Sequence, residues 1–467
     1  MPSFCLHAHF YQPPRGNPFV DMFGLDEVGQ EPGAEPYHNW NEKVTAECYL
    51  PNAELGNFEL MSFDVGATLL RWMEKNAPNT YRFILEADQK HATQHGVGNA
   101  LATPAHSTIL PLARKRDKVS QVYWGMAGFA HRYGRLPQGM WLPETAVDLE
   151  TLQVFHNLGI KFTLLSEAQV DGPVEGAGPY WVKLPEGGQI AVYVRDDSLS
   201  NQLAFNIRTL GGAARWARNP LSPLAKDGRR LTLLAVEGET FGHHHSGEEH
   251  FLHWLLSFEA NAVNQTVTTL ERDVRDNPPQ AEITIKEYTS WSCPHGLGRY
   301  AAGCDCTPGA SNWKGALRRA LDNLSNNLDT HYLNAVETFE LDPLKLRNDY
   351  VQVTLGQTSV AELLAAHGIT KAVEDTIGRI GLLLAAAYFR QRMYTASTFK
   401  YEDLSRPEPR YAIANGLQAI RLTQRATGVD LLPAFRRDIA QAVSNKSGQT
   451  GAQILDALLA EAIAADG

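Results

Sequence analysis

The chain has 467 residues, of which 43% are hydrophobic, so it can bury a large core and an intrinsically disordered protein is excluded. Its formal net charge is −10 and its longest basic run is 114–116, which argues against nucleic acid as the main partner and leaves a polar or neutral small substrate open. The first residues do not resemble a secretory signal, the most apolar segment is about half as long as a bilayer requires, and five cysteines do not suggest a disulfide framework, so we expect a cytoplasmic protein with no membrane partner.

The first 310 residues alternate short apolar runs with amphipathic segments. We predict strands at the apolar runs, which are 3–9, 81–86, 161–165, 189–194, 231–236 and 281–287. Predicted helices show apolar residues at helical spacing: 65–76 with Asp64 as a cap, most of 97–133, the segment from Val147 to Leu158, and 248–275. The Gly- and Pro-rich segment 172–188 is predicted to be a loop. This alternation indicates an α/β fold, a distorted (β/α)7-type barrel over residues 1–310.

The pattern changes beyond residue 310. Apolar residues then follow helical spacing, and no segment shows the alternation of a strand. The predicted helices cover 313–336, 374–395, 410–427 and 431–445. We therefore expect an all-α C-terminal domain over residues 311–467.

Carboxylates follow two predicted strand ends in the first domain. Glu237 and Glu239 come directly after the run 231–236, and Glu144 ends the turn Trp141-Leu-Pro-Glu144. In extended backbone Glu237 and Glu239 would point to the same side, where mutual repulsion raises one pKa toward the range of a general acid. Two strand-end carboxylates suggest acid/base or glycosyl chemistry, although Glu144 could instead belong to the start of the next helix and the 237–239 pair could be solvated.

Histidines are concentrated near the same strand ends. His243, His244 and His245 follow Glu239, and His7 and His9 lie at the end of the first strand. Adjacent histidines rarely converge on one ion, so we interpret these side chains as partners of substrate hydroxyls that also orient the carboxylates. We expect no metal and no cofactor.

Three cysteines and a histidine lie close together in sequence: Cys293, His295, Cys304 and Cys306. A zinc site is one interpretation, but the spacing lacks a C-x-x-C pair. Buried free thiols are the interpretation that we favour from sequence.

Several segments, in chain order, resemble glycoside hydrolase family 57, in the subgroup that carries a helical DUF3536 domain. The segments are His7-Ala-His-Phe-Tyr-Gln-Pro-Pro-Arg15, Pro36-Tyr-His-Asn-Trp-Asn-Glu-Lys-Val-Thr-Ala-Glu-Cys-Tyr49, 98–112, Met140-Trp-Leu-Pro-Glu-Thr-Ala146, Gly238-Glu-Thr-Phe-Gly-His-His-His245, Thr289-Ser-Trp-Ser-Cys-Pro-His-Gly-Leu-Gly-Arg299 and Met393-Tyr-Thr-Ala396. The likeness covers nearly the whole chain.

The resemblance implies a retaining enzyme that hydrolyses or transfers α-glucans and maltooligosaccharides. It places the nucleophile on Glu144 and the acid/base on Glu237, in a double displacement with carboxylates about 5–5.5 Å apart. The substrate-binding residues that we expect are His7, His9, Gln12, Trp141, Glu239, His243, Trp291 and His295. Trp141 offers a flat apolar face of the kind on which sugar rings stack. The partner is an α-glucan or oligosaccharide, and the sequence gives no oligomeric state.

Two positions depart from the family pattern. Glu237 stands where the family has aspartate, and Ala105-His106-Ser107 stands where it has Tyr-Asn-His. Two other functions therefore stay open. One is a catalytically weakened glucan-binding or regulatory protein, and the other is a metal-dependent, deacetylase-like hydrolase that uses His7 and His9.

Overall fold

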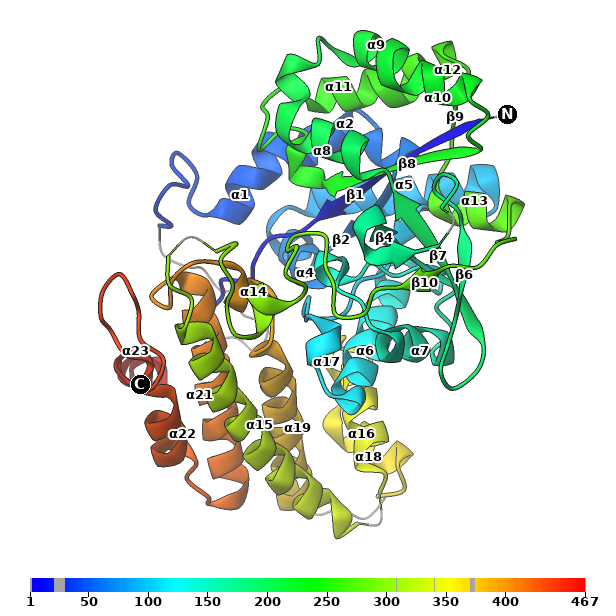
Figure 1. Ribbon diagram of the computed structural model, residues 1–467. Coiled ribbons are helices and arrows are strands. Elements are labelled where there is room, and N and C mark those ends of the chain that lie inside the picture. Colours follow the sequence, from blue (N-terminus) through cyan, green and yellow to red (C-terminus); the bar gives the residue numbers. More distant parts are fainter. Residues whose placement is uncertain are drawn as a thin grey trace. The chain divides into compact units, whose positions relative to one another are not determined.

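The protein is described from a computed structural model (Figure 1), which covers residues 2–20, 30–172, 174–307, 309–339, 341–369 and 374–466. The chain divides into two compact units, and each is described by itself. The first consists of residues 1–12, 29–104 and 129–292, and the second of residues 13–28, 105–128 and 293–467. The second unit thus includes a segment from the middle of the chain, and the domain boundary at residue 310 stays a prediction.

A parallel sheet lies in the core of the first unit. Its strands run in the order β3-β2-β1-β8, and β2, β1 and β8 are labelled in Figure 1. Their bounds are β1 (Ser3–Phe10), β2 (Ser62–Val65), β3 (Ala100–Leu101) and β8 (Leu231–Glu237), and β9 (Thr266–Val267) pairs with the start of β1. β1 and β8 are buried along almost their whole length, as parallel strands covered on both faces are.

The sheet continues into a closed barrel. Single parallel bridges join Ala102 to Met140 and Gly139 to Phe162, the first residue of β4 (Phe162–Ser166). β4 pairs in parallel with β7 (Gln189–Arg195), and the backbone N–H of Asp196 donates to the Leu233 carbonyl of β8 over 2.8 Å. These pairings close the ring of parallel strands, and the predicted distorted barrel is confirmed.

Apolar side chains fill the barrel. They come from β1, β3, β4, β7, β8 and the segment before Glu144: Cys5, Leu101, Trp141, Phe162, Leu164, Ala191, Tyr193, Leu231, Leu233 and Ala235. Gly139 is required for this packing, because a Cβ atom there would lie 2.4 Å from the Phe162 ring. The core therefore fixes the segment that leads to Glu144.

The other elements of the first unit are mostly helices. Its helices are α1 (Trp40–Val44), α2 (Leu50–Glu54), α3 (Asn57–Leu60), α4 (Ala67–Asn76), α5 (Pro78–His95), α7 (Leu149–Asn157), α8 (Asp197–Asn206), α9 (Ala213–Trp216), α10 (Ser222–Lys226), α11 (Glu249–Trp254), α12 (Ala260–Ala262) and α13 (Leu270–Asp276). Its short strands are β5 (Val170–Asp171), β6 (Tyr180–Lys183) and β10 (Thr284–Ile285). Helix α6 (Lys115–Tyr133) has its first part in the second unit.

The predicted strand at 81–86 is wrong, because these residues belong to α5. Buried positions there follow helical spacing, and Pro78 opens the helix at a position where proline is favoured. The strand that was missed is β2, and Asp64 lies on it. Asp64 is therefore no helix cap, and α4 starts only after Gly66.

Other differences are local. The predicted helix 248–275 is interrupted between α12 and α13, where Asn264 has a φ of 64° and β9 joins the sheet. The predicted loop 172–188 contains β6, which pairs antiparallel with β7. Strand 281–287 is reduced to β10, and only the later part of 97–133 is the helix α6.

The second unit is helical, as predicted. Its helices are α14 (Gly298–Ala301), α15 (Trp313–Glu337), α16 (Pro343–Asp349), α17 (Val351–Thr354), α18 (Val360–Ala366), α19 (Glu374–Arg392), α20 (Ser397–Lys400), α21 (Pro407–Thr427), α22 (Leu432–Ile439) and α23 (Gly451–Asp466). Helix α19 packs against α15 and α21. A buried ion pair joins α19 to α6, since Arg390 Nη1 donates to Asp117 Oδ2 over 3.1 Å, and this guanidinium holds the pKa of Asp117 below its usual range against the effect of burial.

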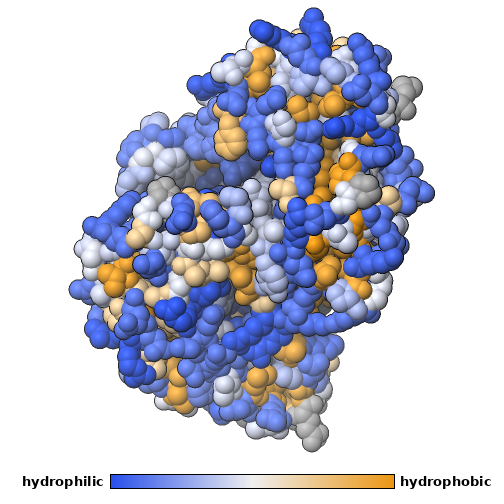
Figure 2. Space-filling view, viewed as in Figure 1, coloured by the Kyte–Doolittle hydropathy of each residue, from blue (hydrophilic) through white to orange (hydrophobic). Residues whose placement is uncertain are grey.

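In the part of the chain that the structure describes, no helix combines the length and apolar character that crossing a membrane requires. The face shown in Figure 2 is largely hydrophilic, with apolar side chains in separate small patches.

Candidate active site

Three parallel strands of the first unit end in one row of ionisable side chains. In the strand register, His9 on β1 lies opposite Asp64 on β2 and opposite Glu237 on β8. Residues in register on neighbouring parallel strands point to the same side of the sheet. The row lies at the carboxyl ends of the strands, where barrel enzymes place their chemistry.

Asp64 is the centre of this row, and the sequence analysis missed its role. Its carboxylate is fully buried and accepts hydrogen bonds from both first-strand histidines, 2.9 Å from His7 Nε2 to Oδ1 and 2.7 Å from His9 Nδ1 to Oδ2. Burial lowers the pKa of His7. Burial also acts to lower the pKa of His9, but the charge and hydrogen bond of Asp64 outweigh it and the pKa is raised. Asp64 thus holds both imidazoles in place and favours the charged form of His9.

Glu144 occupies an unusual backbone conformation. Its φ is 58° and its ψ is 20°, in the left-handed region that non-glycine residues rarely adopt. The Trp291 indole N–H donates to Glu144 Oε2 over 3.2 Å, and the Trp291 backbone N–H donates to the Glu144 carbonyl over the same distance. Asp148, not Glu144, caps helix α7. A partly exposed acidic residue with a strained backbone, held through both its carboxylate and its backbone carbonyl, is typical of a functional position.

Trp141 lies beneath the exposed surface and joins the two carboxylate regions. It has no exposed surface, and its ring stacks on His9 with centroids 4.7 Å apart and on His7 at 5.2 Å. Its edge-to-face contact with Trp291 has centroids 5.1 Å apart. The contacts therefore run from Glu144 through Trp291 and Trp141 to His9, the register neighbour of Glu237.

Two predicted substrate contacts are corrected by this burial. Trp141 and His7 are each 0% exposed, so neither ring can touch a bound sugar. Trp291 is partly exposed and is the aromatic face that remains beside Glu144. The Arg195 guanidinium lies over the Trp291 ring, 4.8 Å from its centroid, and donates to the Ala235 carbonyl of β8, so it ties this ring to the strand that ends at Glu237.

Glu239 does not continue the extended backbone that we expected. Residues Gly238–Thr240 form a 3-10 turn, and the side chain of Glu239 is only 5% exposed. Its Oε1 accepts from the Tyr49 hydroxyl over 2.6 Å and from the Tyr11 backbone N–H over 3.0 Å. Burial raises the pKa of Glu239 to about 7, the Tyr49 hydrogen bond opposes the rise, and the charge of Glu237 adds to it.

The predicted pair of carboxylates therefore contains one group with a raised pKa, and that group is the buried Glu239. Gly238 permits the turn, since a Cβ atom there would lie 2.2 Å from the Phe10 ring. The partly exposed Gln12 hydrogen-bonds the Tyr49 side chain from the other side.

The three consecutive histidines have separate partners. His243 Nδ1 donates to Glu47 Oε2 over 2.6 Å, and its ring meets the edge of Trp40. The backbone N–H of His244 donates to the Glu239 carbonyl, and His245 Nε2 donates to the Ala204 carbonyl. His243 is partly exposed, and its hydrogen bond to Glu47 ties it to the segment that carries Tyr49; its role as a substrate contact stays a prediction.

His295 is not among these residues. It belongs to the second unit, where its Nδ1 lies 3.2 Å from Cys306 Sγ and where Cys293 and Cys304 are close by. The prediction of a substrate contact at His295 therefore has no geometric support in the first unit. The three cysteines are free, as predicted, and Cys293 is buried, but the prediction of burial is wrong for Cys304 and Cys306, which are partly exposed. The fold gathers all three beside His295.

Comparison with known proteins defines the class. The chain matches the model of glycosyl hydrolase family 57 over residues 29–286 and that of a domain of unknown function, DUF3536, over residues 310–465. A barrel with carboxylates at its strand ends is compatible with glycosidase chemistry. The chain belongs to glycosyl hydrolase family 57 and carries a DUF3536 domain, so the resemblance read from the motifs is confirmed.

Individual relatives are distant. Alpha-amylase 1 of Dictyoglomus thermophilum is 24% identical over 179 residues, which are 37% of this chain and 24% of that enzyme. The chain thus aligns with about a quarter of the curated relative's length.

Two solved structures share the fold across the chain. An exo-type maltose-forming amylase from Pyrococcus sp. ST04 has a TM-score of 0.75 at 16% identity, over 98% of this chain and 88% of that one. A branching enzyme of family 57 from Pyrococcus horikoshii has a TM-score of 0.59 at 13% identity, over 99% of this chain and 95% of that one.

Proposed function

We propose that the chain is a retaining enzyme that hydrolyses or transfers α-linked glucose polymers and maltooligosaccharides. The observation that carries the proposal is the line of contacts from Glu144 through Trp291 and Trp141 to His9, beside Glu237. This line of contacts supports joint action of Glu237, at the end of β8, and Glu144, in the turn Pro143–Thr145. The related amylases and branching enzyme point to α-glucans as the substrate class.

Glu144 is the proposed nucleophile. Its carboxylate is partly exposed, and the Trp291 indole N–H orients it by donating a hydrogen bond to Oε2. Attack forms a bond from the carboxylate oxygen to the anomeric carbon, while the bond from that carbon to the leaving oxygen breaks. The two hydrogen bonds from Trp291, to the carboxylate and to the backbone carbonyl of Glu144, limit the reorganisation that this step requires.

Glu237 is the proposed acid/base. In the first step its proton passes to the leaving oxygen, and in the second it takes a proton from water or from an acceptor hydroxyl as that oxygen attacks the glycosyl intermediate. His9 is its register neighbour on β1, and the buried Glu239 follows it two residues later in the chain.

The remaining residues are of two kinds: those proposed to contact the sugar, and those that hold other residues of the site in place. Gln12, His243 and Trp291 are partly exposed and are the proposed sugar contacts. Asp64 and Glu239 are buried. Asp64 positions His9, and Glu239 positions the backbone of Tyr11 and the side chain of Tyr49.

A trapping experiment tests the assignment directly. The purified full chain is incubated with an activated fluorinated maltosyl donor, which reacts with a retaining nucleophile but turns over slowly. Intact-mass and peptide analysis should show one added glycosyl group on Glu144. Labelling at another carboxylate would refute the nucleophile assignment, and incubation of the wild type with maltooligosaccharides and amylose then separates hydrolysis, disproportionation and branching by product analysis.

Glu237 itself favours a second candidate function. A chain whose acid/base has changed from the family's aspartate could bind glucans without turning them over. That function predicts saturable maltooligosaccharide binding by calorimetry with no new products and no trapped intermediate.

A further inference from the structure

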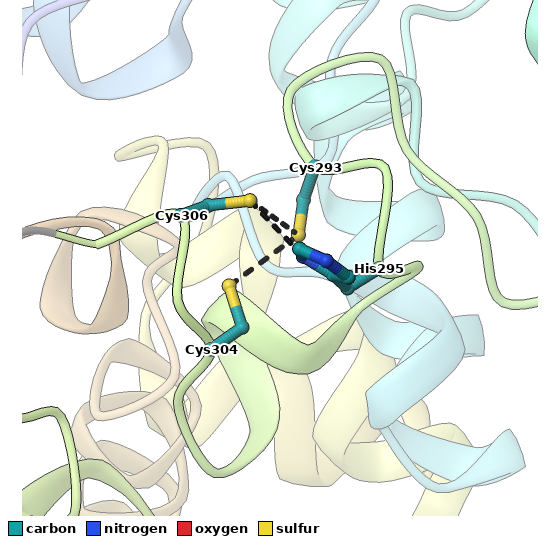
Figure 3. Close-up of side chains that lie close together, drawn as sticks. All are labelled: Cys293, His295, Cys304 and Cys306. Atoms are coloured by element: carbon teal, nitrogen blue, oxygen red, sulfur yellow. Dashed lines mark hydrogen bonds between the residues drawn. The ribbon is translucent and has the colours of Figure 1, made fainter.

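The loop before α15 gathers four potential metal ligands that the proposed catalytic chemistry does not use. Cys293, His295, Cys304 and Cys306 point toward one another in Figure 3. Their ligand atoms all lie within 4.8 Å of one another. Among the residues that the structure describes, this is the one set of three or more such side chains with that geometry.

The distances fit a shared metal ion better than any direct bond. Cys293 Sγ lies 3.5 Å from Cys304 Sγ and 3.8 Å from Cys306 Sγ, and His295 Nδ1 lies 3.2 Å from Cys306 Sγ. Tetrahedral zinc with Zn–S bonds of about 2.3 Å holds its sulfurs about 3.8 Å apart. A disulfide requires about 2.05 Å, and all these cysteines are free.

Backbone groups of the loop hydrogen-bond to two of these sulfur atoms. Backbone N–H groups of His295 and Arg299 hydrogen-bond to Cys293 Sγ, and that of Cys306 hydrogen-bonds to Cys304 Sγ. Such bonds orient and stabilise thiolates as metal ligands.

The polypeptide also turns sharply to bring the two halves of the loop together. Gly303 has a φ of 108°, and a Cβ atom there would lie 2.2 Å from Ser311 Oγ. Its N–H donates to the Gly298 carbonyl over 2.8 Å, which closes the turn that carries Cys304 and Cys306 back to Cys293. The sequence spacing, C-x-H followed by C-x-C, has no C-x-x-C pair, and this turn supplies the convergence instead.

We propose that Cys293, His295, Cys304 and Cys306 bind one structural zinc ion. Four protein ligands leave no position for water, so the site is closed and its role is to stabilise the fold. Zinc with three thiolates carries a net charge of −1. Buried Lys314, which donates to the Arg299 carbonyl and to Thr307 Oγ1, supplies a cation at the start of α15 beside this loop.

A zinc ion there would fasten residues 293–306 to one another. This segment contains only the single-turn helix α14, and Leu297 and Tyr300 are its main buried apolar side chains. Such a short, loop-rich segment buries little apolar surface, and metal binding is a common source of stability in that situation.

Metal content of the full chain tests the proposal. The full chain is produced in zinc-supplemented medium, any affinity tag is removed, and its metals are measured by mass spectrometry. We expect about one zinc per chain, bound to three sulfurs at about 2.3 Å and one nitrogen at about 2.0 Å in X-ray absorption spectra. Cobalt exchanged into the site should show sulfur-to-metal charge transfer and intense tetrahedral visible bands.

Variants assign the ligands. Cys304→Ser and Cys306→Ser should lose the zinc, whereas Cys5→Ala, which removes a buried cysteine of the barrel, should keep it. Because His295 is exposed, two substitutions there should leave the fold intact. His295→Ala should release zinc more readily to a chelating dye, and His295→Cys should retain it.

The wild-type measurement decides the matter even if a cysteine variant fails to fold. If the purified chain has five free thiols and contains no zinc, the proposal is overturned. A disulfide between two of the three loop cysteines, stoichiometric iron in place of zinc, or a zinc spectrum with oxygen and nitrogen ligands alone would overturn it too.

Discussion

The barrel end contains an outer and an inner set of residues, and they differ in what burial allows them to do. The outer set, which is partly exposed, is Glu144, Glu237, His9 and Trp291. The inner set, which is almost or fully buried, is His7, Asp64, Trp141 and Glu239. Both sets are polar or aromatic and both come from strand ends or the turns that follow them, so residue type alone does not separate them.

Buried residues can only position other side chains, whereas partly exposed residues can also contact the substrate. Asp64 has no exposed surface but fixes His9, and Trp141 has none but is packed between His9 and Trp291. Substitution in the outer set should therefore change turnover with the fold intact, and substitution in the inner set should change stability first.

The largest expected effect is on turnover. Glu144→Gln removes the nucleophile and keeps the side chain's shape, so kcat should fall by a factor on the order of 10⁴ or more. Release of reducing ends from maltooligosaccharides measures the fall. Glu150→Gln, an exposed change in the first turn of helix α7, is the matched control and should keep nearly full activity. If the Glu144→Gln chain folds and keeps wild-type turnover, Glu144 is not the nucleophile.

The two tryptophans give the most direct comparison of the sets. Trp141→Ala should lower the free energy of unfolding by about 3–5 kcal/mol, because it opens a cavity beneath His7 and His9. Trp291→Ala should cost less stability and should raise KM, since it removes the exposed aromatic face. Urea denaturation followed by circular dichroism and steady-state kinetics on the same two proteins separate these effects, and a stable Trp141→Ala chain would contradict the inner assignment.

Glu239 links stability to pH. Its pKa is about 7 in the folded chain, above the ordinary 4.5, so the folded state binds this proton more tightly than the unfolded state. The contribution of Glu239 to the free energy of unfolding therefore falls as pH rises from about 4.5 to about 7, by about 3 kcal/mol in all.

Glu239→Gln keeps an acceptor for Tyr11 and Tyr49 but cannot ionise. The variant should be more stable than the wild type at about pH 8 by up to about 3 kcal/mol, and the gain should vanish near pH 4.5. Thermal unfolding across this pH range measures the difference. An equal difference at both ends would show that ionisation of Glu239 is not its cause.

The smallest expected effect separates the two candidate functions. If Glu237 is the acid/base in this chain's own geometry, Glu237→Asp withdraws the carboxyl group by about an ångström and kcat should fall by about 10- to 100-fold. Initial rates on one maltooligosaccharide measure it. A rate that rises instead would identify the wild type as a weakened relative of active enzymes.

Much of the fold could be predicted from the sequence. β1, β4, β7 and β8 are continuous apolar runs, and α15, α19 and α21 have long amphipathic patterns, so their elements follow from local chemistry. β2 could not be found in this way, because it has four residues and includes a charge. Its identity as a strand depends on pairing with β1, which no local pattern records.

The same limit applied at the candidate site. Glu144, Glu237 and His9 could be picked out because each follows an apolar strand or a distinctive turn. Asp64 was interpreted as a helix cap because the signal for it is only an acid between Phe63 and Val65 before a glycine, and its two imidazole partners are more than fifty residues away in sequence.

The sequence by itself determined the α/β barrel, the helical second part, the family and the candidate carboxylates, because apolar periodicity and short motifs are local properties of the chain. The tertiary structure alone decided which polar residues are exposed, that Asp64 holds both histidines, and that three cysteines converge with His295. Each of these depends on contacts between segments distant in sequence or on a tight turn, and hence on how the whole chain packs.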